Sequence, residues 1–80
     1  MHDIIKRLAM IHELEVGVDV NDNITVSFRN GYVSDTPFLI GTCGRGKTIE
    51  EAAEDYHKKI SGRLIVIDGS KGYRKEFYII

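Results

Sequence analysis

The residues best suited to chemistry in this chain lie between Gly41 and Thr48, where glycines precede a lysine and a threonine. Their spacing satisfies G-x-x-x-x-G-K-T, the pattern in which backbone N–H groups and a lysine hold phosphates. A helix that begins directly after the pattern would add the positive end of its dipole. The string therefore predicts weak anion binding at Gly46, Lys47 and Thr48.

Nucleotide hydrolysis requires more than this string. The apolar run at residues 64–67, followed by Asp68, is similar to the strand that ends in a magnesium-binding Asp in P-loop enzymes. Those enzymes bind the nucleotide at the edge of a parallel sheet of several βαβ units, and 80 residues leave room for one crossover. We therefore predict a protein that is not an enzyme, with no catalytic residue and no cofactor. A nucleotide-binding P-loop variant stays an alternative.

Other reactive side chains are isolated. Cys43 lies in the glycine-rich stretch, and His57 lies more than two helical turns after Thr48, so the pattern indicates a packed thiol rather than a nucleophile with a base. His2 and His12 share no ligand spacing with either residue, and we predict no metal site.

Composition narrows the class of protein. Eleven basic and twelve acidic side chains give a formal charge of −1, which supplies no general attraction to nucleic acid. One cysteine allows no internal disulfide, which favours the cytoplasm. The N-terminal stretch is charged throughout and lacks the apolar run of a signal peptide or membrane span, so we expect no membrane association.

The first half of the chain predicts a helix followed by antiparallel strands. Apolar residues at helical spacing indicate a helix over residues 2–13. Valines then alternate with polar residues over residues 15–20, and a second alternating run covers residues 24–29. Asn30-Gly31 is a strong signal for a tight hairpin, which would start a third strand at Tyr32. Pro37 should mark a bulge, bend or break before residues 38–40.

The second half predicts a helix and a final hairpin. Thr48 and Glu51 have the spacing of a capping box, and Gly62 suits a left-handed helix end. An apolar stripe follows the capping box, made of Ile49, Ala52, Ala53, Tyr56 and Ile60. Residues 64–67 and 77–80 read as two strands around a turn at residues 69–72. We expect one α+β domain over residues 1–80, in the order α-β-β-β-α-β-β, with both helices packed on one sheet.

The segment Gly46-Lys47-Thr48-Ile49-Glu50-Glu51-Ala52 resembles the strand-to-helix turn of HicB-like antitoxin domains, whose spacing is G-x-T-x-E-E-A. The resemblance covers roughly residues 24–67 and implies a partial RNase H-like core. It also implies dimerisation and a small ribonuclease toxin as partner. Residues 59–64 and Arg74-Lys75-Glu76 are similar to small phage and prophage proteins, which implies a regulator of a host protein.

A helix, three antiparallel strands, a glycine turn and a helix also form the order of double-stranded RNA-binding domains. Under this alternative the nucleic-acid contacts would be Arg45, Arg74 and Lys75. Glu50 and Glu51 stand where those domains carry phosphate-binding lysines, so nucleic acid is not the favoured partner.

Self-association is the default expectation for a chain of this size. The apolar C-terminal run would leave an exposed strand edge in a monomer. We predict a homodimer or larger homo-oligomer, which also binds a protein partner, either a toxin or a host protein. The predicted interface consists of Tyr73, Phe77, Tyr78 and Ile80.

Overall fold

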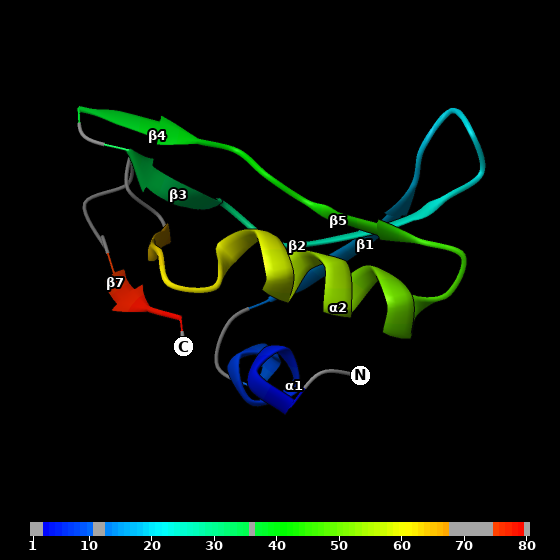
Figure 1. Ribbon diagram of the computed structural model, residues 1–80, viewed down its shortest axis with the longest axis horizontal. Helices are drawn as coiled ribbons and strands as arrows, with labels where there is room; N and C mark the ends of the chain where they lie inside the picture. The colour runs from blue at the N-terminus through cyan, green and yellow to red at the C-terminus, as the bar shows by residue number, and fades with distance from the viewer. Residues whose placement is uncertain (1–2, 11–12, 36, 68–74, 80) are drawn as a thin grey trace.

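The computed structural model describes residues 3–10, 13–35, 37–67 and 75–79 of the chain. It confirms the α+β class, with two helices and seven strands in two antiparallel sheets (Figure 1). In chain order the elements are α1 (Asp3–Ala9), β1 (Leu14–Val18), β2 (Ile24–Phe28), β3 (Gly31–Asp35), β4 (Phe38–Ile40), β5 (Gly44–Gly46), α2 (Ile49–Ile60), β6 (Leu64–Ile67) and β7 (Lys75–Tyr78).

The expectation of a single sheet is wrong. One sheet has the order β1-β2-β5 and the other has the order β4-β3-β6-β7. The chain passes from one to the other three times, from β2 into β3, from β4 into β5, and from β5 through α2 into β6. Figure 1 shows the first two passages as a bent two-stranded ribbon. Seven positions separate Val26 from Val33 on one side of the ribbon, but four separate Ile40 from Gly44 on the other. The three additional residues on the first side bend the ribbon.

The bend is where the sequence predicted a hairpin. Asn30 has a φ of 54°, the left-handed conformation that asparagine tolerates. Gly31 has no such angle, and a Cβ there would lie 3.0 Å from both the Cβ and the carbonyl oxygen of Phe28. Asn30-Gly31 therefore bends the chain between two sheets, and β2 does not pair with β3. The hairpin turn lies instead at Pro37, between β3 and β4, where the sequence predicted a bulge, bend or break.

The first helix ends at Ala9, earlier than the predicted residue 13, and Glu13 already joins the sheet before β1. The carbonyl oxygen of Glu13 accepts the N–H of Arg29 at 2.8 Å, which extends the pairing of β1 with β2. The strand also ends earlier than expected. The Asp19 carboxylate accepts the N–H groups of Asn21 and Asn23 at 2.9 and 3.0 Å, and this Asx turn stops β1 at Val18.

The second helix follows its prediction closely. Thr48 is the N-cap, its Oγ1 accepts the N–H of Glu51 at 3.1 Å, and Gly62 has a φ of 74° after the last turn. α2 packs mainly on β5 and β2. The buried core joins both sheets through Ile5, Val26, Phe28, Val33, Ala52, Ala53, Tyr56, Ile60, Ile65, Ile67 and Ile79. In its centre the Tyr56 hydroxyl accepts the N–H of Phe28 at 3.2 Å.

Candidate functional site

The glycine-rich stretch is an extended strand that lies directly against α2. A Cβ on Gly44 would overlap the carbonyl oxygen of Ala52 and the backbone nitrogen of Tyr56. A Cβ on Gly46 would lie 2.6 Å from that of Glu51. Neither glycine has a positive φ. The glycines therefore permit the close packing of a strand on a helix.

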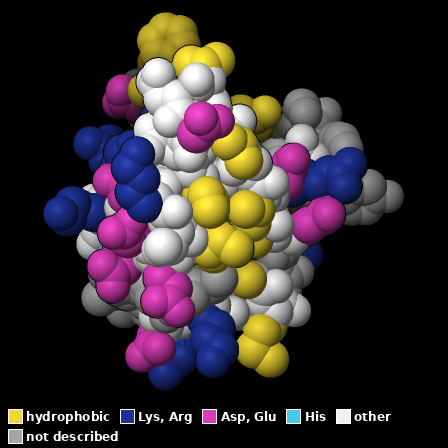
Figure 2. Space-filling model, turned by 90° about the vertical axis from the view of Figure 1, so that its right-hand side faces the viewer, with side chains coloured by type: hydrophobic (Ala, Val, Ile, Leu, Met, Phe, Trp, Pro, Cys, Tyr) yellow, Lys and Arg dark blue, Asp and Glu magenta, His cyan; other side chains and the backbone are white. Residues whose placement is uncertain are grey.

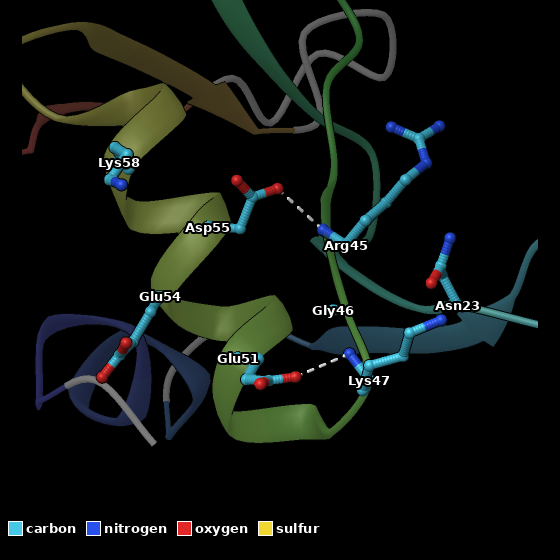
Figure 3. Close-up of a pocket in the computed structure, with 8 residues that line it drawn as sticks. All are labelled: Asn23, Arg45, Gly46, Lys47, Glu51, Glu54, Asp55 and Lys58. Atoms are coloured by element: carbon cyan, nitrogen blue, oxygen red, sulfur yellow. Dashed lines mark hydrogen bonds between the residues drawn. The ribbon is translucent and has the colours of Figure 1, made fainter.

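Carboxylates of α2 accept the N–H groups on the side of β5 that faces away from β2. Asp55 Oδ2 accepts the N–H of Arg45 at 2.8 Å, and Glu51 Oε2 accepts the N–H of Lys47 at 2.8 Å (Figure 3). The Lys59 ammonium bonds both Asp55 Oδ2, at 2.9 Å, and the Cys43 carbonyl, at 3.0 Å. The helix thus closes this edge of the sheet with its own side chains.

These contacts bear on the predicted anion site at Gly46, Lys47 and Thr48. The N–H of Lys47 already donates to a carboxylate, and the Thr48 hydroxyl accepts the cap bond from Glu51. A phosphate at these groups would have to displace Glu51 and then lie beside its charge. The Glu51 carboxylate therefore occupies the position where the sequence predicted a bound anion.

An open groove of about 510 Å³ runs between β5 and α2. Basic and acidic side chains occur in equal number on its walls, so it favours neither an anion nor a cation. Figure 3 shows the Arg45 side chain directed away from α2, toward the side of Asn23. The lining residues are Asn23, Arg45, Gly46, Lys47, Glu51, Glu54, Asp55 and Lys58.

Two carboxylates beside this groove are held ionised. The N–H of Asn23 lowers the pKa of Asp19, and the Arg45 guanidinium, 3.3 Å from its Oδ2, adds to the effect. The N–H of Arg45 lowers the pKa of Asp55, assisted by Lys59. Burial raises the pKa of the Tyr56 hydroxyl, which lies in the core. The carboxylates hold backbone and cations in place, and the described residues include no group of His, Cys, Asp or Glu side chains that could hold a metal.

The other predicted site residues are separated by the fold. Arg45 lies on β5 and Lys75 on β7, in different sheets, while Arg74 lies outside the described residues. Tyr73 and Ile80 of the predicted interface also lie outside them. Phe77 packs against the core, but Tyr78 is 75% exposed. Of that interface, Tyr78 is the described residue that presents a large apolar surface to solvent.

The structure also exposes apolar residues that lie outside the predicted interface. In β4, Phe38, Leu39 and Ile40 are all exposed, and Phe38 has 68% of its surface accessible. The signal in the sequence is a run without charge, from residue 36 to residue 44. We call Phe38, Leu39 and Ile40 the β4 edge.

A second exposed apolar surface lies on β1. Val16 and Val18 pair with Val26 and Ile24, so they point to the same side of the sheet as the core, yet they are 52% and 68% exposed. α2 lies over β5 and β2 and leaves this part of the sheet open. Figure 2 shows hydrophobic side chains gathered at this end of the molecule, with charged side chains on both sides. Ile49, in the first turn of α2, is also exposed.

Comparison of the chain with protein-family models, with curated proteins and with solved structures found no match in any of the three. Among the described residues, no helix has the length and apolar character needed to cross a membrane.

Proposed function

We propose that this chain is a non-catalytic binding protein that self-associates and binds a protein partner, which it inhibits or regulates. The observation that carries the proposal is the β4 edge. An edge strand presents unpaired backbone groups, and proteins usually protect such a strand with charges. Here the three residues are apolar and exposed, at the outer position of the order β4-β3-β6-β7.

The charge around the β4 edge favours a protein over a nucleic acid. Between Asp35 and Arg45 no residue is charged. Affinity for nucleic acid comes mainly from lysines and arginines that neutralise phosphates, and this edge has none. An extended segment of another protein could add to the edge through backbone hydrogen bonds, while its apolar side chains cover Phe38 and Ile40.

The resemblance to HicB-like antitoxins makes a small ribonuclease toxin the first partner to test, and a host protein the second. Both would be met in the cytoplasm, where a protein with a single cysteine needs no disulfide. The antitoxin role rests on the segment from Gly46 to Ala52, most of which the structure uses to start α2.

The order of the β1-β2-β5 sheet favours one alternative, a nucleic-acid-binding protein. Its three antiparallel strands follow α1 and precede α2, as in double-stranded RNA-binding domains. Two observations weigh against it. Arg45 pairs with Asp19, and the first turn of α2 carries Glu50 and Glu51.

The test compares Phe38→Lys with Tyr78→Lys. The first change removes the apolar side chain from the β4 edge but places the new charge opposite Asp35, which supports the hairpin. The second makes the same change at the other edge of the same sheet. The tagged chain would be used to capture proteins from extracts of its source cells, and affinity would then be measured with the purified captured protein.

We expect the unchanged chain and Tyr78→Lys to capture the same protein. Phe38→Lys should bind that protein at least about tenfold more weakly, because apolar residues at the centre of an interface typically contribute more than about 1 kcal/mol. Equal capture by both variants would contradict the β4 edge as the binding site. Capture of nucleic acid, with affinity that falls steeply as salt rises, would favour the alternative.

A further inference from the structure

The outer edge of β1 presents backbone groups at regular spacing. At one end of the strand the Glu13 carbonyl accepts the N–H of Arg29 at 2.8 Å, and at the other the N–H of Asp19 donates to the Asn23 carbonyl at 2.9 Å. Both residues therefore turn their backbone groups toward β2. Because these groups alternate along a strand, those of Leu14, Val16 and Val18 point to the opposite edge. Within the described part of the chain, no strand pairs with that edge.

We propose that a second copy of this chain pairs with β1, antiparallel and with Val16 opposite Val16 of the second copy. In this register Leu14 lies opposite Val18 of the second copy. All three outward-facing residues then form hydrogen-bonded pairs, and the two β1-β2-β5 sheets become one continuous sheet. The inference specifies how the self-association in the proposed function occurs, and it does not depend on what binds the β4 edge.

Charge selects this register over its neighbours. With Val16 at the centre, Glu15 lies opposite Gly17 of the second copy, on the solvent side of the sheet. A shift of the pairing by one step in either direction would place Glu15 opposite another Glu15 or opposite Asp19. Like charges directly opposite each other destabilise a pair of strands.

The ends of the paired strands are also compensated. Glu13 would lie opposite Asp19 of the second copy, but each carboxylate has an arginine of its own chain. Arg29 Nη1 lies 3.0 Å from Glu13 Oε2, and Arg45 Nε lies 3.3 Å from Asp19 Oδ2. Both contacts approach their carboxylates from within the same copy.

Pairing would also cover exposed apolar surface. Val16 and Val18 lie on the side of the sheet that carries α2, and the same side chains of the second copy would lie next to them. The edges of β5 and β7 are less suitable. Glu51 and Asp55 already occupy that of β5, and Lys75 and Glu76 are exposed on β7.

The test uses two substitutions at one position, Gly17→Lys and Gly17→Glu. A Cβ at Gly17 would lie 3.1 Å from the Thr25 hydroxyl, so both variants require the same small adjustment within the chain. In the proposed dimer they differ sharply, because the new side chain lies opposite Glu15 of the second copy at two symmetric places. Sedimentation equilibrium of the purified chain would measure the dimer dissociation constant, and chemical denaturation would check that both variants remain folded.

We expect the unchanged chain to form a dimer and Gly17→Lys to dimerise at least about tenfold more tightly than Gly17→Glu. High salt should reduce this difference. Adding Glu15→Lys to Gly17→Glu should restore tight dimerisation. A monomer, or equal dissociation constants for the two variants, would overturn the inference while leaving the binding of a protein at the β4 edge open to its own test.

Discussion

The backbone of Gly44 lies against the carbonyl oxygen of Ala52, and no side chain fits between them. This contact, one turn of α2 against one strand, sets where the helix lies on its sheet. It brings α2 over β5 and β2, and the inner residues of β1 are left exposed. The requirement for glycine at position 44 of β5 is therefore linked to the exposed apolar surface on β1.

Gly44→Ala should destabilise the fold by about 1–3 kcal/mol, because the added methyl group must push α2 away from β5. The matched control is Gly41→Ala. Its Cβ would lie 3.8 Å from the nearest atoms, in the Tyr32 ring, and should be nearly neutral. Urea denaturation of both variants measures the difference. Similar losses at the two positions would contradict the close packing described for β5.

Thr48→Ala should cost about 1 kcal/mol in the free energy of unfolding, because the N-cap bond to the N–H of Glu51 is lost. Lys47→Ala should be close to neutral, since the backbone N–H that bonds Glu51 is unchanged by the substitution. Chemical denaturation distinguishes the two effects. Greater damage from Lys47→Ala would show that the lysine side chain has a structural role absent from these contacts.

The stability of the fold should decrease at acidic pH because Asp55 becomes protonated. Its pKa is lowered in the folded state, chiefly by the N–H of Arg45, so the unfolded chain binds a proton first as the pH falls. The contribution of Asp55 is therefore complete above the ordinary pKa of an aspartate, about 4, and is lost as the pH falls below it. Asp55→Asn should lower stability at neutral pH and flatten its dependence on pH in the acidic range.

Thermal unfolding measured from neutral to acidic pH tests this expectation, with Glu54→Gln as the control. Figure 3 shows the Glu54 side chain directed away from β5. Some acid dependence should remain in Asp55→Asn, because hydrogen bonds also lower the pKa of Asp19. An unchanged acid slope in Asp55→Asn would refute the assignment.

Calorimetric titration with ATP or GTP should detect no magnesium-dependent binding in the micromolar range, and no hydrolysis should follow. A P-loop curves around phosphates with its N–H groups directed inward, whereas this segment is an extended strand whose Lys47 N–H donates to Glu51. The interpretation would be wrong if such binding occurred and disappeared in Lys47→Ala. A weak, magnesium-independent response to phosphate would support the anion site that the sequence predicted.

Local sequence determined α2 almost completely. Thr48, Glu51 and Gly62 mark its start and end. Of the predicted apolar stripe, Ala52, Ala53, Tyr56 and Ile60 are buried, and Ile49 in the first turn is exposed. These features depend on residues within a few positions of each other, so the sequence contains the whole signal. The alternation in β2 and the strand at residues 64–67 were predictable for the same reason. The last strand was predicted over residues 77–80, but it runs from Lys75 to Tyr78.

The tertiary structure alone decided which strands pair and which surfaces stay exposed. Asn30-Gly31 suits a tight turn, but the pairing of β3 with β6, more than thirty residues apart in the chain, makes it a bend between sheets. Val16 and Val18 alternate like core residues, yet they are exposed because α2 lies over β5. Both outcomes depend on the free energy of contacts between distant segments, which no short stretch of sequence specifies.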